Sequence, residues 1–326
     1  LKDKANFEHL FKFIMPIVKK YIFSLGFVLL FFAGVCQQDP QFSQILFNPM
    51  SINPGYAGSL NMVGFGAINK LQWTGFGDGA PVSTAVSINT PIAPFGFKSG
   101  IGLSIVNDKF GYNNDLGINF AYSARFKFKA VEGTLGVGVS GGIVNNSINP
   151  QWRALNVAGD PSIPQEKESN INMDLGFGLY YNTDYMFFGV SATHLNESKM
   201  YKTKESAHYT RQYYITGGYT VNLNPAWQLE PSVLITTDLT TSRYSLNSII
   251  KYNKKFWGGV SYRMGEAVTG MIGLELFNGI KFGYAYDYSL GKMSSYNNGS
   301  HEFMLGYNFQ LKKEKPPQQY KSIRFL

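Results

Sequence analysis

A glycine-rich stretch is the part of the sequence whose spacing comes nearest to a cofactor-binding motif. Residues 136–141 read GVGVSG, the spacing of a dinucleotide fingerprint, in which the N-terminus of a following helix holds the pyrophosphate. Residues 142–146, GIVNN, favour a strand end and a loop instead of that helix. We therefore interpret the glycines as inward-facing positions of a β-strand, and we expect no cofactor.

The histidines and the cysteine lack the spacing of a metal site. His9, His194, His208 and His301 include no pair four residues apart, and Cys36 has no second cysteine to pair with. We expect no metal ligand, no nucleophile elbow and no catalytic residue. An outer-membrane hydrolase remains an alternative, because spacing does not reveal a dispersed Ser-His-Asp triad.

The composition is typical of a membrane β-barrel. The 326 residues include 35 glycines, 16% aromatic and 15% charged residues, against about 25% charged residues in soluble proteins. A mean hydropathy of −0.12 is too low for a bundle of membrane helices. The net charge is +8, of which residues 1–36 contribute three, and the remainder is dispersed. A nucleic-acid partner is therefore not expected, because it would require clustered basic residues.

Residues 1–36 have the features of a targeting segment. Lys19 and Lys20 precede the apolar run 22–35, which is short for a membrane span, and glutamines follow Cys36. We predict a signal peptide over 1–36 cleaved after Cys36, with 1–14 as an over-called start before Met15. An acylated Cys36 and an uncleaved helical anchor are the alternatives.

Beyond residue 60, apolar and polar residues alternate with period two, which indicates strands with one face in lipid and one in a polar lumen. Around 114–129, one face carries Leu116, Ile118, Phe120, Tyr122, Ala124, Phe126 and Phe128, and the other carries Gly117, Asn119, Ala121, Ser123, Arg125, Lys127 and Lys129. Residues 280–288 alternate in the same way, with Phe282, Tyr284 and Tyr286 opposite Gly283, Ala285 and Asp287.

These patterns predict an all-β fold, an antiparallel transmembrane barrel of about 14 strands over residues 61–311. The segments are 62–71, 82–91, 98–108, 115–128, 131–143, 173–181, 185–194, 209–222, 227–237, 243–252, 255–263, 267–276, 280–288 and 301–311. Every second connection is short, as expected for periplasmic turns, and the longest connections belong to the other set. Both chain ends are then expected on the periplasmic side, including the basic tail 312–326.

The longest connections are expected to be outer loops. We predict that the loop within 143–172, with Trp152 and Arg153, carries a surface contact with a partner.

Charged residues on the predicted inner face either line a pore or form salt bridges that fill it, and the sequence leaves both possibilities open. They are Arg125, Lys127, Arg211, Arg243, Lys251, Arg263, Glu275, Lys281, Asp287 and Glu302.

The segment before the first strand, residues 37–60, combines turn-forming Asp-Pro and Asn-Pro pairs with apolar residues that would not be left in water. The apolar residues are Phe42, Leu46, Phe47 and Tyr56. We interpret the segment as a plug or brace in the periplasmic mouth, as a docking surface for a partner, or as both.

At these residues the sequence resembles the PorP/SprF family of the type IX secretion system. The resemblance rests on Asp39, Pro40, Gln41, Phe42, Ser43, Gln44, Phe47, Asn48, Pro49, Asn53, Pro54, Tyr56, Ala57, Gly58 and Ser59, and more weakly on a closing strand near 300–307. It covers the chain from this segment to the closing strand.

The resemblance implies a non-enzymatic outer-membrane component of protein secretion or gliding. Its expected partners are a large secreted adhesin or the C-terminal domain of that adhesin, periplasmic subunits of the secretion system, and outer-membrane lipid. The alternative function is a diffusion channel or a transporter of small hydrophobic molecules.

Overall fold

The computed structural model describes residues 39–128, 132–150, 166–200, 208–276 and 278–310. The predicted leader, Trp152, Arg153 and the basic tail lie outside these residues. Among the residues described, no helix has the length and the apolar character needed to cross a membrane.

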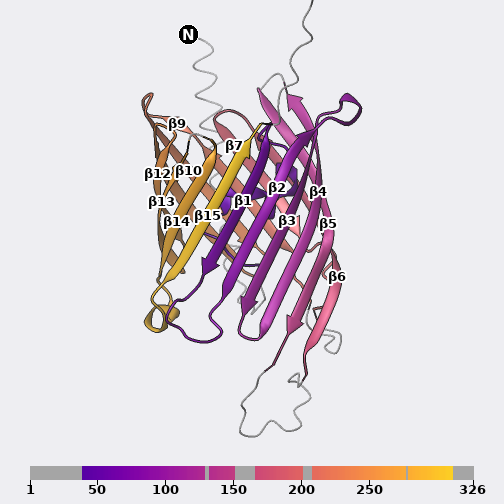
Figure 1. Cartoon of the computed structure of the whole chain (residues 1–326), viewed down its shortest axis with the longest axis vertical. Coiled ribbons are helices and arrows are strands. Elements are labelled where there is room, and N and C mark those ends of the chain that lie inside the picture. Colours follow the sequence, from indigo (N-terminus) through magenta and orange to yellow (C-terminus); the bar gives the residue numbers. More distant parts are fainter. Residues whose placement is uncertain (1–38, 129–131, 151–165, 201–207, 277, 311–326) are drawn as a thin grey trace, which may run out of the picture. The chain divides into compact units, whose positions relative to one another are not determined.

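The strands form one closed antiparallel sheet (Figure 1). Neighbours in sequence pair with each other, β15 pairs with β1, and β10 pairs with β11, so the ring has no free edge. The strands are β1 Val63–Leu71, β2 Val82–Ile92, β3 Ser99–Phe110, β4 Asn113–Phe128, β5 Gly133–Ile148, β6 Glu168–Asn182, β7 Met186–Thr193, β8 Gln212–Tyr219, β9 Val221–Asn222, β10 Trp227–Thr237, β11 Ser242–Tyr252, β12 Phe256–Arg263, β13 Ala267–Glu275, β14 Ile280–Ser289 and β15 Ser300–Phe309.

The short strand β9 is a continuation of β8. It follows β8 after one residue, and both pair with β10. When β8 and β9 are counted as one strand, the barrel has fourteen strands, and the predicted fourteen-stranded barrel is confirmed.

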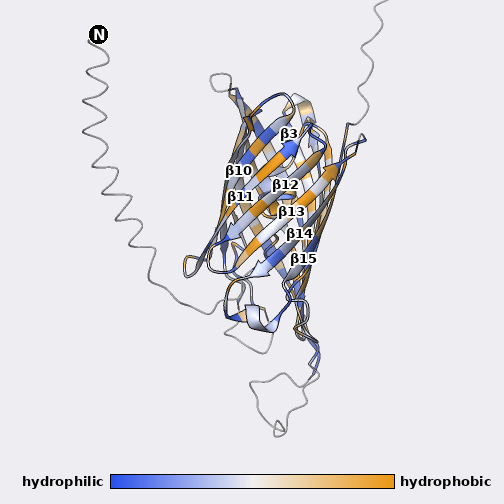
Figure 2. Ribbon diagram, turned by 90° about the vertical axis from the view of Figure 1, so that its left-hand side faces the viewer, coloured by the Kyte–Doolittle hydropathy of each residue, from blue (hydrophilic) through white to orange (hydrophobic). Residues whose placement is uncertain are grey.

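The two faces of each strand differ as the alternation predicts. On β4, Phe120 is 53% exposed on the outer face, whereas Ser123 and Arg125 are buried on the inner face. On β14, Tyr288 is exposed and Asp287 is buried. Figure 2 shows the same alternation of apolar and polar positions along the wall. The outer face is thus apolar, as contact with lipid requires.

The two ends of the barrel differ in their connections. At one end, which we call the turn end, the strands are joined by residues 93–98, 129–132, 183–185, 223–226, 253–255 and 276–279. The last of these turns contains Asn278 and Gly279, a pair favoured in hairpins, and Gly279 has a φ of +85°. The opposite end, the loop end, carries the longer connections 72–81, 149–167, 194–211 and 290–299. This alternation of short and long connections is typical of outer-membrane barrels.

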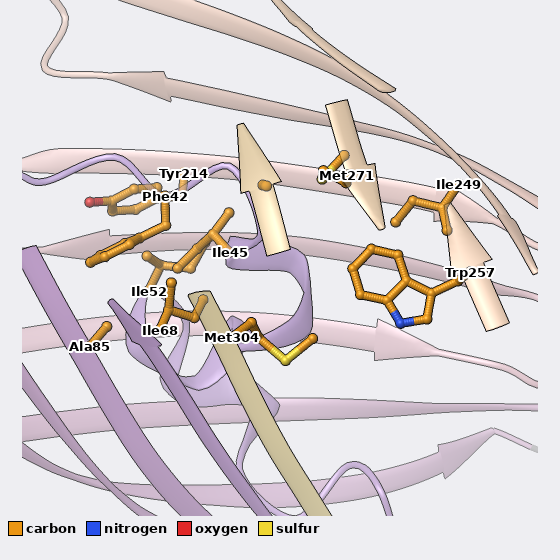
Figure 3. Packing of buried hydrophobic residues seen from close by; sticks show 11 residues of the cluster. Phe42, Ile45, Ile52, Ile68, Ala85, Tyr214, Ile249, Trp257, Met271 and Met304 are labelled. Atoms are coloured by element: carbon orange, nitrogen blue, oxygen red, sulfur yellow. The ribbon is translucent and has the colours of Figure 1, made fainter. Parts of the chain in front are cut away.

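Residues Asp39–Ser59, which we call the luminal segment, lie inside the barrel. They form three short 3-10 turns, Ile45–Phe47 (η1), Pro49–Ser51 (η2) and Pro54–Tyr56 (η3); η4 (Pro94–Gly96) and η5 (Lys292–Tyr296) lie in connections. The core of the molecule is formed between this segment and the inner wall. In Figure 3, Phe42, Ile45 and Ile52 lie beside Tyr214, Ile68 and Met304 of the wall.

Candidate functional site

Four buried charged residues on one side of the inner wall form a cluster that we call the charged clamp. It consists of Lys70 (β1), Arg263 (β12), Asp287 (β14) and Glu302 (β15), each less than 9% exposed. Lys70 Nζ lies 2.7 Å from Asp287 Oδ2 and 3.8 Å from Glu302 Oε2, and Arg263 Nη2 lies 3.8 Å from Asp287 Oδ2. Two cations thus balance two carboxylates, which is the condition for burying charges.

The clamp binds the luminal segment mainly through the backbone of its first residues. The amides of Ser43 and Gln44 donate to the two oxygens of Glu302, each at 2.7 Å. Lys70 donates to the carbonyl of Gln41 at 3.0 Å. These charge-assisted bonds are stronger than neutral ones, so they hold the motif residues 41–44 against the wall.

The hydroxyl of Ser43 joins the two halves of the clamp. It donates to Asp287 Oδ1 at 2.7 Å and accepts from Arg263 Nη2 at 3.0 Å. Thr269 of β13 donates to the same oxygen of Asp287. A hydroxyl suits this position because it acts as donor and acceptor at once.

Asp39, the first described residue, is held at the loop end by His194. His194 Nε2 lies 2.9 Å from Asp39 Oδ1, and His194 Nδ1 lies 2.8 Å from Asp174 Oδ1. Tyr214 and Thr193 donate to the other oxygen of Asp39, at 2.6 and 3.3 Å. His194 therefore bridges two carboxylates, an arrangement that favours the imidazolium form.

The pKa values at this contact follow from its geometry. Burial alone would raise the pKa of Asp39, but the charge and hydrogen bond of His194, with the donors Tyr214 and Thr193, hold it below its ordinary value. Burial alone would lower the pKa of His194, but the charge of Asp39 and the hydrogen bonds to Asp174 and Asp39 raise it well above 6.5. The pair is thus charged at neutral pH.

Towards the turn end the luminal segment lies directly on the wall, along a surface that we call the glycine track. It is formed by Gly100 (β3), Gly136 and Gly138 (β5) and Gly178 (β6). A Cβ atom at any of the four would come closer than 3.0 Å to the segment, mostly to backbone atoms of residues 53–58. Only glycine allows the two backbones to approach this closely.

The track explains two of the three glycines in the dinucleotide-like pattern. Gly136 and Gly138 face Pro54 and Gly55, whereas Gly141 lies on the outer face, where a Cβ would meet only Leu175 of the neighbouring strand at 3.8 Å. The inward placement that we expected is therefore wrong for Gly141. Residues 138–142, GVSGG, also have the spacing of a nucleophile elbow, but they lie within β5, which continues to Ile148 in place of the helix that the elbow requires.

Polar side chains fix the luminal segment at the turn end. Arg125 donates to the carbonyl of Ala57 at 3.3 Å and to Asn182 Oδ1 at 2.9 Å. Asn89 accepts from the amide of Gly58 at 3.2 Å. Burial raises the pKa of Tyr56 to about 12, although Ser59 and the charge of Arg125 act in the opposite direction.

Three more hydrogen bonds hold the middle of the segment. Asn53 donates to the carbonyl of Leu179 at 3.0 Å, and Ser191 donates to the carbonyl of Ile52 at 2.7 Å. Ser87 donates to Asn48 Oδ1. The motif residues Phe42, Ser43, Gln44, Asn48 and Asn53 are all buried.

The remaining charges singled out in the sequence lie apart from the segment. Lys251 pairs with Glu230 at 2.7 Å, Lys281 with Glu275 at 3.3 Å, and Arg243 with Glu266 at 2.9 Å. Arg211 pairs with Glu197 in an exposed position, and Lys127 is exposed near the turn end. Of the charges predicted on the inner face, Arg125, Arg263, Asp287 and Glu302 meet around the luminal segment.

Sequence reasoning missed Lys70, Asp174 and His194. Lys70 follows Gly66 and Ile68 at period two, and that spacing was the available signal for an inward cation. His194 and Asp174 carry no local signal, because their partner Asp39 is far away in the sequence.

A small cavity lies in the lumen beside the segment. A cavity of about 100 Å³ is lined by Asp39, Asp115, Asp174 and His194, among others. In the described part of the chain, no three or more His, Cys, Asp or Glu residues are arranged to hold a metal ion.

Comparison with solved structures finds outer-membrane barrels of low sequence identity. The Ralstonia pickettii toluene transporter TbuX is 10% identical with a TM-score of 0.49, over 80% of this chain and 92% of that one. The CymD monoaromatic hydrocarbon channel is 12% identical with a TM-score of 0.49, over 81% and 93%. Acinetobacter baumannii Omp33 is 8% identical with a TM-score of 0.44, over 76% and 98%.

A search of curated proteins finds no match. The model of one protein family, described as type IX secretion system membrane protein PorP/SprF, matches residues 35–307. That range includes the luminal segment and nearly all of the barrel. The chain therefore belongs to the PorP/SprF family of type IX secretion system membrane proteins.

Proposed function

We propose that this protein is a non-enzymatic accessory or anchor of type IX secretion in the outer membrane, which holds a protein partner rather than conducting solutes. The observation that carries the proposal is the occupied lumen. The luminal segment contacts the inner wall along its length, and four buried charges of the wall are neutralised around it. An open channel would leave such charges facing water.

The partner class follows from the family. A large secreted adhesin, or the C-terminal domain of that adhesin, is the proposed cargo, and periplasmic subunits of the secretion system are the proposed neighbours. Contact with these partners falls to the ends of the barrel, because the outer face of the wall is apolar and the lumen is filled.

Two measurements test this proposal. Purified wild-type protein in a planar bilayer should show little steady conductance, and deletion of residues 39–59 should open the lumen. A large steady conductance of the wild-type protein would contradict the proposal and favour a diffusion channel or a transporter of small hydrophobic molecules.

Affinity purification from native membranes, followed by mass spectrometry, tests the partner. An adhesin or periplasmic secretion subunits should co-purify with the wild-type protein. The matched control is a variant lacking residues 151–165, which leaves the luminal segment intact. If the adhesin co-purifies with the wild-type protein but not with this variant, the contact lies in that loop. If the wild-type protein purifies without any such partner, the result counts against the anchor function.

A further inference from the structure

The luminal segment has a direction, and its amino end lies towards the loop end of the barrel. Asp39 contacts Thr193, the last residue of β7, and His194, the first residue beyond it. Tyr214, its third partner, stands near the start of β8. The connection between β7 and β8 is one of the long ones, so these three contacts place Asp39 beside the long loops.

The next residues of the segment also contact the wall near the loop end, on the strands β1 and β15. Lys70, which binds the carbonyl of Gln41, is the last residue but one of β1, and β1 ends at the loop end. Glu302, which binds Ser43 and Gln44, is the third residue of β15, and β15 begins at the loop end.

The carboxyl end of the segment lies at the turn end. Gly58 has a φ of +72° and lies against Pro91 near the end of β2 and Gly100 near the start of β3, whose connection is a short turn. The chain then enters β1 at Val63, which pairs with Phe309, the last residue of β15. The last strand of the barrel therefore also finishes at the turn end.

Asp39 and Phe309 thus lie at opposite ends of the barrel, whereas the sequence-based expectation placed both ends of the chain, which lie outside the described residues, on the periplasmic side. That expectation counted strands and assumed that the residues before β1 stay at the end where β1 begins. The segment instead crosses the lumen lengthwise before β1. Only its last residues, near 54–59, brace the mouth at the turn end.

We propose that Asp39, at the amino end of the luminal segment, lies at the cell-surface end of the barrel, while Phe309, the last residue of β15, lies at the periplasmic end. The inference goes beyond the accessory function proposed above. It rests on the contacts of the segment and on the rule that the longer loops of an outer-membrane barrel face outward. Asp39 then adjoins the start of the connection after β7, at the end of the barrel that is available to an extracellular protein partner.

Cysteine labelling on intact cells tests this topology. In a Cys36→Ala background, single cysteines are introduced by Gln38→Cys, by Ser295→Cys at the loop end and by Phe95→Cys at the turn end. Ser295 and Phe95 are both exposed, so they serve as the surface and periplasmic controls. A membrane-impermeant maleimide should label Gln38→Cys and Ser295→Cys equally on intact cells, and Phe95→Cys only after the outer membrane is permeabilised.

Each other pattern overturns the proposal. Labelling of Gln38→Cys only after permeabilisation would place the amino end in the periplasm. If Gln38→Cys is not labelled under either condition although the barrel is heat-modifiable, position 38 is buried. If Phe95→Cys is labelled on intact cells and Ser295→Cys only after permeabilisation, the turn end faces the cell surface. An epitope inserted between Gln38 and Asp39 supplies a second measurement: antibody should bind intact cells, and binding that requires permeabilisation counts against the proposal. These outcomes are independent of the cargo and of the conductance.

Discussion

The charged clamp and the glycine track hold the same segment by opposite means. At the clamp, Glu302 and Asp287 bind the segment through charge-assisted hydrogen bonds from buried positions. At the track, Gly136 and Gly138 contribute no side chain and let the segment's backbone rest on that of the wall. The charged clamp depends on balanced charges, and the glycine track depends on the lack of side chains. Different substitutions should therefore disrupt them.

The largest effect is expected from Glu302→Gln. The variant replaces a carboxylate that accepts from two backbone amides with an amide that presents one acceptor and one donor, and it removes one of the two carboxylates close to Lys70. Breaking a buried pair in this way costs about 3–5 kcal/mol. The apparent unfolding midpoint of the heat-modifiable barrel should fall, and conductance should rise as the segment is released.

Glu275→Gln is the matched control for this variant. Glu275 and Lys281 form a partly exposed pair at 3.3 Å, which should be worth less than about 1 kcal/mol. If both glutamine variants had the same small effect, the charged clamp would not be what holds the segment.

A smaller effect is expected from Gly138→Val at the track. The added side chain would collide with backbone atoms of Pro54 and Gly55, and overpacking typically costs about 1–3 kcal/mol. Because the segment can move away from the wall, the clearest reading is increased conductance with a closed, heat-modifiable barrel.

Gly141→Val on the same strand provides the comparison for steric effects. Its side chain would point outward and meet only Leu175, so assembly and conductance should match those of the wild-type protein. An equal disturbance by the two valines would indicate that β5 simply tolerates valine poorly, and the close approach at the track would lose its significance.

The smallest effect is a pH dependence at Asp39. The pKa of His194 is raised above 6.5, so its contribution to stability is complete below pH 6.5 and is lost as the pH rises through the raised value. The pKa of Asp39 is lowered below 3.8, so its contribution is present above pH 3.8 and is lost as the pH falls through the lowered value. The amino end of the segment should therefore be held most firmly between these limits.

His194→Gln should remove the alkaline part of this dependence, as measured by labelling of a Pro40→Cys variant against pH. His208→Gln is the control, since His208 lies in the same connection and its Nδ1 faces the carbonyl of Glu197 at 3.2 Å. Unchanged labelling of Pro40→Cys across the pH range in the wild-type background would show that His194 does not secure the segment.

Much of the barrel could be predicted because its rules are local. The alternation on β4 and β14 identified the apolar face, and the lengths of the connections alone distinguished the turn end from the loop end. The strand limits differ mainly where strands extend into long loops, as β5 does to Ile148 and β6 does from Glu168. There residues 145–147 and 168–170 are polar at successive positions, so period two gives no boundary.

The charged clamp illustrates what could not be predicted. Arg263, Asp287 and Glu302 were recognised as inward charges, but whether they line a pore or fill it was undecided. The answer depends on Ser43 and Gln44, more than two hundred residues away in the sequence. The alternation of apolar and polar residues along a strand does not indicate a contact between residues so far apart in the sequence.

The sequence by itself determined a closed barrel with an apolar outer face, because each strand records in its alternation which side meets lipid. Only the tertiary structure decided that Asp39–Ser59 crosses the lumen from the loop end to the turn end. The direction of the luminal segment depends on where the charged clamp and the glycine track lie on the inner wall. Those positions come together only when the sheet closes.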